Sequence, residues 1–263
     1  MKRNGDVALV GAKRPEVVLA GHSHAVAMLD SVDREPARRV RAAVLVPRDG
    51  SHEFLGDPGY RDAFLRVAEG KVAGVVWDGN QHIGLFLVDS MPGFQVFRPG
   101  VVDAGHDPGR RWVSEEMLRC LWRGDAPWTT DSLEALLRQL AHASPRVVLF
   151  GTPPPKPERL VRAALGADPF FVSLLERESM EPDTVPLTPG PVMIAMWQVI
   201  QDIYRDAAAD TGALFVPVPD SVMDRDGYLL DRYSPPGDTS HANGDYGAVM
   251  WAQLSDALGS RHA

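Results

Sequence analysis

His22, Ser23 and His24 directly follow an apolar run near the start of the chain, in the stretch VVLAGHSHAVAML. Two chemistries fit these residue types. The two imidazoles could hold a transition metal, because neutral histidine is a common ligand of zinc, iron and nickel. Alternatively, Ser23 could be a nucleophile at a turn between a strand and a helix, provided that a base and oxyanion donors lie nearby.

The metal hypothesis draws on a second segment, GNQH at residues 79–82. GHSH and GNQH resemble motifs of the calcineurin-like metallophosphoesterases, and such a site would use His22, His24 and His82 with Asp238 or His241. That family opens with Asp-x-His on its first strand, whereas GHSH comes first here and no GDxxD motif follows. A metallophosphoesterase therefore stands as an alternative.

The nucleophile hypothesis draws on the other end of the chain, where DTSHANGDYGAV places Asp238 three residues before His241. A carboxylate can orient an imidazole and stabilise its protonated form, while the imidazole takes the proton from Ser23. Ser23 also precedes a predicted helix, whose first backbone N–H groups would point at a developing negative charge. An ordinary helix cap would use the same position, so Ser23 alone does not separate the two interpretations.

The elements that would position these residues alternate along the chain. Short apolar runs typical of strands occur at Val17–Ala20, Val40–Val46, Val72–Trp77, Arg146–Phe150 and Ala213–Val218. Helical patterns lie between and after them, at Ala25–Ser31, Tyr60–Glu69, Ser132–Ala143, Val192–Asp210 and Gly244–Leu258. This alternation predicts parallel strands joined by right-handed crossovers. We therefore expect an α/β fold, a three-layer αβα sandwich with a flavodoxin-like parallel sheet of five strands.

Two regions fall outside this alternation. Residues 84–131 are expected to form a loop-rich insertion with one helix around Ser114–Trp122, and residues 165–191, which contain five prolines, a second excursion. Neither has the apolar pattern of an independent domain, so residues 1–263 are predicted to form a single domain. Ligands of open parallel sheets bind beyond the carboxyl ends of the strands, which places GHSH and the segments after the later strands at the candidate site.

The serine after the first predicted strand and the late Asp-x-x-His resemble the arrangement in the SGNH hydrolases, also called the GDSL family. The resemblance spans roughly residues 15–258 and implies that Ser23, His241 and Asp238 form a catalytic triad. The first block differs from Gly-Asp-Ser-Leu, since His22 replaces the aspartate and His24 the leucine. The resemblance implies the fold of that family, and the altered block leaves its activity as a separate question.

Two further blocks of that family supply oxyanion donors. The third is usually Gly-x-Asn-Asp, and Asn80 takes the place of its asparagine, although a plain turn is the alternative. The second contributes a glycine N–H after the second strand; Gly50, Gly56 and Gly59 all lie there, and Gly56 is preferred. His24, beside the nucleophile, could bind substrate or compete for the serine proton, and His82 could join it at the same rim. The alternative for each is an ordinary surface or hydrogen-bonded histidine. The candidates for lining the pockets are Phe170, Phe171, Trp112 and Trp128.

Composition bounds the remaining classes. The 263 residues are 44% hydrophobic and 24% charged, which is typical of a soluble globular protein. A net charge of −8 gives no general attraction to nucleic acid or to anionic membrane. Cys120 is the only cysteine, which excludes an intramolecular disulfide. No apolar stretch is long enough for a signal peptide or a membrane span, so a cytoplasmic location is expected.

The resemblance to the SGNH hydrolases implies a serine esterase or deacetylase. Its substrate would be a small ester, such as an O-acetyl group carried by a carbohydrate, and the chemistry requires neither a metal nor another cofactor. A catalytically silent domain of the same fold, binding a carbohydrate or a protein, is the alternative from another class. The oligomeric state is not predicted.

Overall fold

The computed structural model describes residues 7–48, 55–89, 93–98, 107–124 and 129–259. Its main sheet has six strands in the order β1-β3-β2-β4-β7-β8. They are β1 (Val7–Gly11), β2 (Val17–Gly21), β3 (Ala42–Pro47), β4 (Val72–Val76), β7 (Arg146–Phe150) and β8 (Leu214–Val216). Strands β3, β2, β4, β7 and β8 are parallel to one another, as predicted. Strand β1 adds an antiparallel edge strand beside β3. The sheet therefore has six strands instead of the predicted five.

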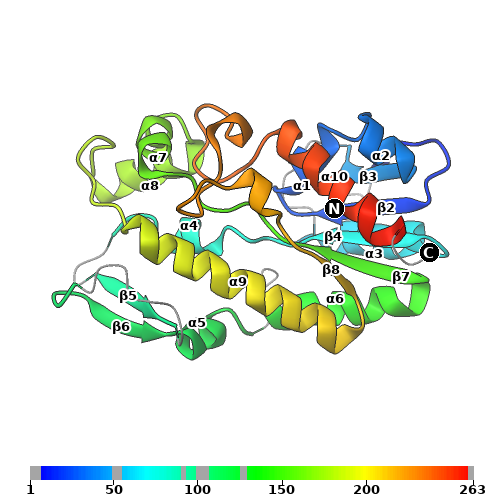
Figure 1. The fold of residues 1–263 in the computed structure, drawn as a ribbon, viewed down its shortest axis with the longest axis horizontal. Coiled ribbons are helices and arrows are strands. Elements are labelled where there is room, and N and C mark those ends of the chain that lie inside the picture. Colours follow the sequence, from blue (N-terminus) through cyan, green and yellow to red (C-terminus); the bar gives the residue numbers. More distant parts are fainter. Residues whose placement is uncertain (1–6, 49–54, 90–92, 99–106, 125–128, 260–263) are drawn as a thin grey trace.

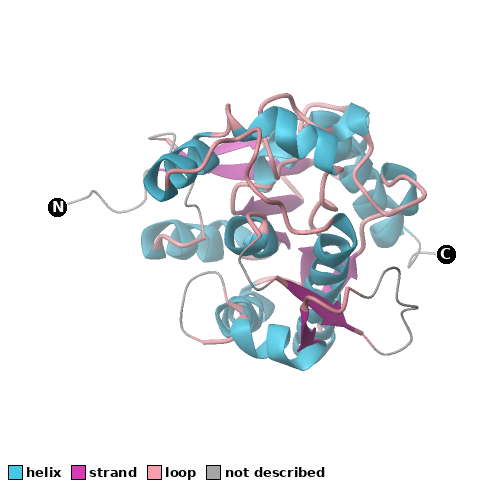
Figure 2. Ribbon diagram, turned by 90° about the vertical axis from the view of Figure 1, so that its left-hand side faces the viewer, coloured by secondary structure: helices cyan, strands magenta, loops and turns pink. Residues whose placement is uncertain are grey.

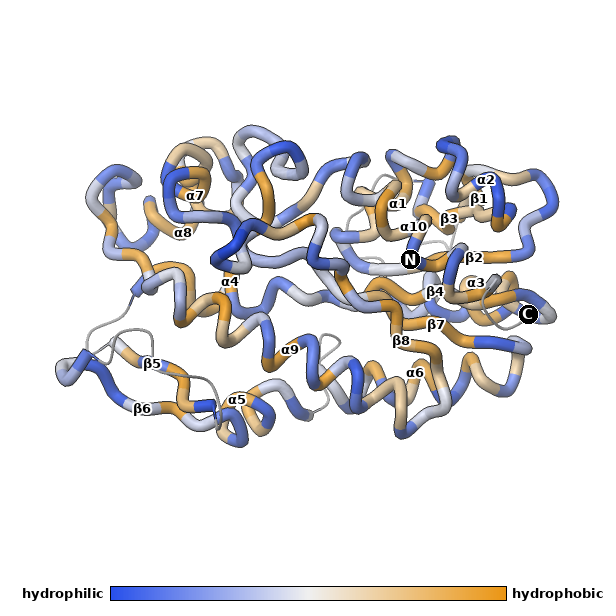
Figure 3. Tube along the Cα trace, in the orientation of Figure 1, coloured by the Kyte–Doolittle hydropathy of each residue, from blue (hydrophilic) through white to orange (hydrophobic). Residues whose placement is uncertain are grey.

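Helices cover both faces of this sheet, which gives three layers (Figure 1). One face carries α1 (Ala25–Leu29), α2 (Glu35–Arg39) and α10 (Gly244–Gly259), and the other carries α3 (Pro58–Ala68), α6 (Thr130–Ala143) and α9 (Gly190–Thr211). Successive strand residues point to opposite faces, so Val18 packs in one apolar core and Leu19 in the other. The strands accordingly read as continuous apolar runs in Figure 3.

Local signals explain where several helices begin and end. Asp57 caps α3 by accepting the Tyr60 N–H at 2.8 Å, and Pro58 follows at the first helical position. Gly212 ends α9 in the left-handed conformation, at φ 72°. Gly247 lets α10 approach α1 closely, because a Cβ there would lie 1.9 Å from the Ala27 carbonyl oxygen. The last helix is thereby held against the helix that follows Ser23.

The region 84–131 contains more regular structure than predicted. Its helix α5 (Glu115–Leu121) confirms the expected helix, and Ser114 caps it at the Met117 N–H. The strands β5 (Phe94–Phe97) and β6 (Arg111–Ser114) form a separate parallel pair (Figure 2), which the sequence did not indicate. The short helix α4 (Gln81–Phe86) precedes this pair.

The prolines of residues 165–191 suggested a loop, but the structure forms a helix there. Helix α7 (Glu158–Leu165) is followed by α8 (Pro169–Glu178), with two 3-10 turns later, at Asp220–Val222 and Asp231–Tyr233. Pro169 occupies the first turn of α8, where its missing N–H costs nothing, and Asp168 caps that helix at the Phe170 N–H. The proline that suggested a break is therefore the start of a helix.

None of the helices in the described residues is both long and apolar enough to cross a membrane.

Candidate active site

The predicted site residues gather beyond the carboxyl ends of the parallel strands. Strand β2 lies between β3 and β4, so the connections leaving β2 and β4 diverge at this point of the sheet, which is where ligands bind in such folds. Ser23 lies two residues after β2, and Asn80 follows β4. The Ser23 turn is closed by the hydrogen bond from Ala25 N–H to the His22 carbonyl, 2.9 Å. His22 N–H donates to the Val76 carbonyl at 3.0 Å, which ties this turn to the end of β4.

Asp238 and His241 form a hydrogen-bonded pair in the loop before α10. One carboxylate oxygen, Asp238 Oδ2, lies 2.8 Å from His241 Nδ1. The other, Oδ1, accepts the backbone N–H groups of Ser240 and His241 at 2.8 and 2.6 Å. Burial would raise the pKa of Asp238, but the hydrogen bond and charge of His241 outweigh it and hold the pKa below its usual range. Asp238 is therefore ionised at neutral pH.

This pairing assigns the tautomer of His241. With the Nδ1 proton directed at the carboxylate, Nε2 carries the lone pair that a general base needs. His241 Nε2 is buried and makes no hydrogen bond. His241 Nε2 is therefore not hydrogen-bonded to Ser23 Oγ. The hydrogen bond between a nucleophile and its base often forms only when substrate binds.

His24 brings the Ser23 turn against the loop that carries His241. The two imidazole rings lie with their centroids 5.0 Å apart, at 53° to each other. His24 is 4% exposed, and neither of its ring nitrogens has a hydrogen-bond partner. Burial, followed by the nearby His241, lowers the pKa of His24 well below its ordinary value, so this ring is neutral at pH 7. The first and last predicted blocks thus meet in space.

Asn80 lies at the start of α4 with its side chain unused by the helix. Its carbonyl accepts the Ile83 N–H at 2.9 Å, but its amide makes no capping hydrogen bond. The preceding Gly79 has φ 93°, and a Cβ there would lie 2.3 Å from the Thr152 side chain. Only glycine fits both the backbone angle and the space. This tight turn fixes the Asn80 backbone and leaves the amide able to donate.

The glycine of the second block is placed only in part. Gly56 lies in the turn between buried Leu55 and the Asp57 cap of α3, and Gly59 is inside that helix. Gly50 lies outside the described residues. Arg61 of α3 donates to the Leu55 carbonyl at 3.2 Å. Burial and then the charge of this arginine lower the pKa of His22 to about 4, which places α3 beside the GHSH turn.

Only some of the residues of the metal hypothesis lie together: the His24 ring lies against that of His241, and the charge of His82 also acts on His24. His82 is 0% exposed, so it lies in the interior and not at the expected rim, and burial lowers its pKa to about 3. His22 instead packs its ring edge-on against Trp77, with centroids 5.0 Å apart. Within the described part of the chain, no three His, Cys, Asp or Glu side chains are arranged to hold a metal ion. The arrangement therefore gives the metallophosphoesterase alternative no support.

Two charged residues near His241 were missed by the sequence reasoning. Lys156 donates its Nζ to the Asp238 carbonyl at 2.6 Å, and Asp78, directly after the Trp77 that ends the third apolar run, is near enough for the charge of His241 to affect it. Burial raises the pKa of Asp78 to about 6. One signal was available for Lys156, because it is one of only four lysines and follows the three prolines after β7. No comparable signal marked Asp78.

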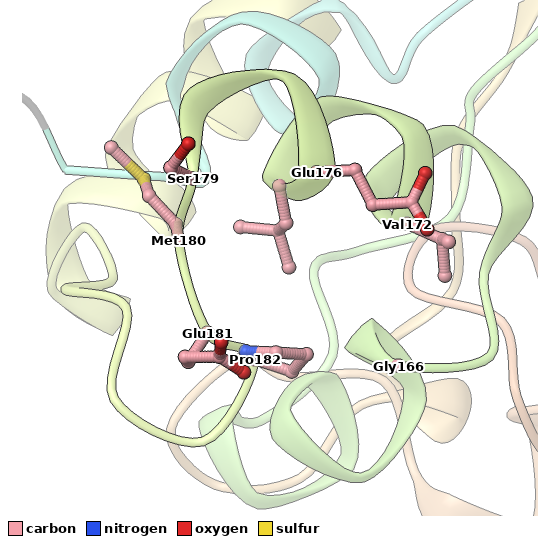
Figure 4. Close-up of a pocket in the computed structure, with 8 residues that line it drawn as sticks. Gly166, Val172, Glu176, Ser179, Met180, Glu181 and Pro182 are labelled. Carbon is pink, nitrogen blue, oxygen red and sulfur yellow. The ribbon is translucent and has the colours of Figure 1, made fainter.

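A hollow of 430 Å³ lies away from these residues, beside α7 and α8 (Figure 4). Its lining comes from the end of α7, one face of α8 and the segment after it: Gly166, Val172, Leu175, Glu176, Ser179, Met180, Glu181 and Pro182. None of the predicted site residues lines it. The hollow is therefore separate from the Ser23 turn and the Asp238–His241 pair.

Comparison with solved structures finds proteins with a similar architecture. A Bacteroides fragilis protein described as an acylhydrolase superposes with a TM-score of 0.50 at 12% identity, covering 96% of this chain and 91% of that one. This chain shares the fold of that solved structure. A GDSL-like lipase from Bacteroides thetaiotaomicron has a TM-score of 0.47 at 11% identity, covering 93% and 88% of the two chains. A carbohydrate acetylesterase from Sinorhizobium meliloti has a TM-score of 0.45 at 10% identity, covering 94% and 100%.

The likeness to these structures concerns the fold. The predicted α/β fold with its mostly parallel sheet is confirmed, and an identity of 12% carries no residue roles. Comparison of the sequence with protein-family models and with curated proteins finds no match. What the site does is consequently argued from its own geometry.

Proposed function

We propose that this protein is a serine ester hydrolase of the SGNH type, with Ser23 as nucleophile, His241 as base and acid, and Asp238 as the residue that orients His241. The observation that carries the proposal is the Asp238–His241 pair, which holds the imidazole by Nδ1 at 2.8 Å and leaves a buried, unbonded Nε2. The His24 ring lies against His241, so the residue next to Ser23 borders the base.

The proposed reaction has two halves. Ser23 Oγ attacks the acyl carbon of the ester while His241 Nε2 takes the hydroxyl proton, and the collapsing tetrahedral intermediate expels the alcohol, which receives that proton. Water then attacks the acyl carbon while His241 Nε2 takes a proton from it, the bond to Ser23 Oγ breaks, the carboxylic acid leaves and Ser23 Oγ recovers the proton from His241. Asp238 is ionised and stabilises the imidazolium in both halves.

The negative oxygen of each tetrahedral intermediate needs donors. We assign this role to the Ser23 N–H, the Asn80 amide and a glycine N–H near Gly56. The unused Asn80 amide at the start of α4 supports that assignment. The substrate we propose is a small ester, such as an O-acetyl group on a carbohydrate, and the reaction requires no metal or other cofactor. A nucleic-acid or membrane partner is not part of the proposal, and the protein is proposed to act in the cytoplasm.

The test is the intact mass of the protein after exposure to a fluorophosphonate, which reacts covalently with activated serines. Wild type should gain one adduct, and Ser23→Ala should gain none. Ser240→Ala is the matched control, because the Ser240 hydroxyl lies 3.3 Å from His241 Nδ1 and is the other serine at the base. This variant should be labelled like wild type.

Each other result has a definite meaning. Labelling that persists in Ser23→Ala but disappears in Ser240→Ala would move the nucleophile to Ser240. A wild type with neither adduct nor hydrolysis of p-nitrophenyl acetate would overturn the proposal. Ligand binding that survives in Ser23→Ala would then favour the catalytically silent binding domain.

A further inference from the structure

Lys156 is buried against the loop that carries the proposed base. Its side chain is 0% exposed, and it directly follows the three consecutive prolines after β7. Lys156 Nζ donates to the Asp238 main-chain carbonyl at 2.6 Å and lies 3.5 Å from Asp238 Oδ1. The hydrogen bonds of this ammonium group, within the described residues, are all to Asp238.

A buried ammonium group is costly unless it is paired, and here a single carboxylate supplies the pairing. Burial lowers the pKa of Lys156, while the charge and hydrogen bond of Asp238 raise it again. Asp238 Oδ2 is at the same time bonded to His241 Nδ1. The carboxylate is thus shared between a lysine and the imidazole that must become positive during the proposed reaction.

We infer that Lys156 is a positioning residue for the proposed reaction, which holds the Asp238 backbone and uses its positive charge to keep His241 unprotonated at mildly acidic pH. The inference rests on the proposed function, since it concerns the base of that reaction. A positive charge beside the carboxylate reduces the attraction between that carboxylate and the imidazolium. His241 then stays available as a base at lower pH than Asp238 alone would allow.

Among the residues that the structure describes, three other titratable groups face this pair or Lys156. Asp78 and His24 also face His241, and Asp168 faces Lys156. His24 is neutral at pH 7 because burial depresses its pKa. Among these groups, Lys156 is the basic side chain that contacts the carboxylate of the Asp238–His241 pair.

The experiment compares Lys156→Met, Lys156→Gln and Lys156→Arg with wild type. Glutamine can still donate to the Asp238 carbonyl but has no charge, whereas arginine keeps the charge. Lys71→Met is the matched control, because Lys71 Nζ also donates to a main-chain carbonyl, that of Val67 at 2.7 Å, and precedes β4 at the opposite end of that strand. The readouts are the pH profile of kcat/KM for p-nitrophenyl acetate and the proton titration of the His241 ring by NMR.

In the two neutral variants, the acid limb of the pH profile and the NMR midpoint should both move up by about one pH unit. Lys156→Arg and Lys71→Met should keep the wild-type midpoints. A uniform fall in kcat/KM without movement of either midpoint would overturn the inference and leave Lys156 a merely structural role. Failure of both neutral variants to fold would also count against it, because the inference assigns the charge to tuning His241 and not to stability.

The NMR titration keeps this inference separate from the proposed function. If wild type neither gains a fluorophosphonate adduct nor hydrolyses p-nitrophenyl acetate, the esterase proposal fails, yet the His241 midpoint still reports whether the lysine charge acts on the ring. If labelling depends on Ser23 but the midpoint is the same in all variants, the esterase proposal stands and the inference about Lys156 fails.

Discussion

Two asparagines near the site show how one residue type serves different purposes. Asn243 accepts the N–H groups of Asp245 and Tyr246 at 3.0 and 3.3 Å, so its side chain caps the start of α10. Asn80 stands at the start of α4 but makes no such bond. A polar side chain left unused at the carboxyl edge of the sheet suits a role toward substrate, whereas the cap serves stability.

This contrast gives a paired prediction. Asn80→Ala should lower kcat for p-nitrophenyl acetate by about 100-fold or more and leave the melting temperature near that of wild type, because one oxyanion donor is lost. Asn243→Ala should lower the stability by about 1 kcal/mol, the usual cost of a lost helix cap, with little change in kcat. Steady-state kinetics and thermal unfolding of both variants are the measurements. Equal kcat in Asn80→Ala and wild type would remove Asn80 from the oxyanion site.

At the scale of elements, α4 and α8 meet beside the site. Gly84 N–H donates to the Asn80 carbonyl at 3.0 Å, so Gly84 lies one turn further along α4. A Cβ at Gly84 would lie 4.0 Å from the Phe170 ring of α8. Asp168, which caps α8, accepts the Thr239 N–H at 3.1 Å in the loop of Asp238 and His241. Phe170, which is 57% exposed, thus stands between the helix of Asn80 and the loop of the base.

This position predicts a contribution to substrate choice. Phe170→Ala should lower the ratio of kcat/KM for p-nitrophenyl butyrate over acetate by about tenfold, since each buried methylene contributes about 0.8 kcal/mol. Phe97 is a matched control, because this exposed ring lies on the β5–β6 pair and packs on Trp112. Phe97→Ala should leave the ratio unchanged. An unchanged ratio in Phe170→Ala would place the acyl group elsewhere.

The elements also show what the sequence could predict. Strands β2, β3, β4, β7 and β8 and the long helices were predicted because each buries a run or stripe of apolar residues. The short pair β5–β6 has no such signal, since it is partly exposed, and α8 was hidden by Pro169 at its first turn. The Asp238–His241 pair lies within one loop and was readable as a motif. Lys156 contacts Asp238 across 82 positions, and a contact of that kind is visible only in the fold.

At the scale of the molecule, the site joins four segments that lie far apart in the sequence. The Ser23 turn follows β2, the Asn80 turn follows β4 and the segment that ends at Lys156 follows β7. The loop of Asp238 and His241 precedes α10, the last helix. The parallel sheet brings them to one edge, so the site exists only when the whole sheet has formed. The site also places imidazoles in the interior, and this has a consequence for stability.

Buried neutral histidines make the fold sensitive to acid. Burial lowers the pKa of His22 to about 4 and that of His82 to about 3, from 6.5 in the unfolded chain. Between each lowered pKa and 6.5, the unfolded chain binds more protons than the folded chain. The free energy of unfolding therefore falls as the pH falls from 6.5, by up to about 1.4 kcal/mol per pH unit for each ring. Asp78 acts in the opposite direction, because its pKa is raised to about 6 and its proton uptake favours the folded chain as the pH falls.

Together with His24, whose pKa burial also lowers, these two histidines outweigh the single carboxyl, so the melting temperature should fall steadily from pH 6.5 to pH 4. His82→Phe removes one of these histidine titrations, in a side chain that is 0% exposed, and the slope of melting temperature against pH should become shallower in this variant. His142→Phe, at an exposed position of α6, should keep the wild-type slope. The slope is the decisive quantity, because any packing strain from the phenyl ring lowers the melting temperature equally at every pH. Identical slopes in His82→Phe and wild type would show that the His82 ring takes up its proton over the same pH range in the folded and the unfolded chain.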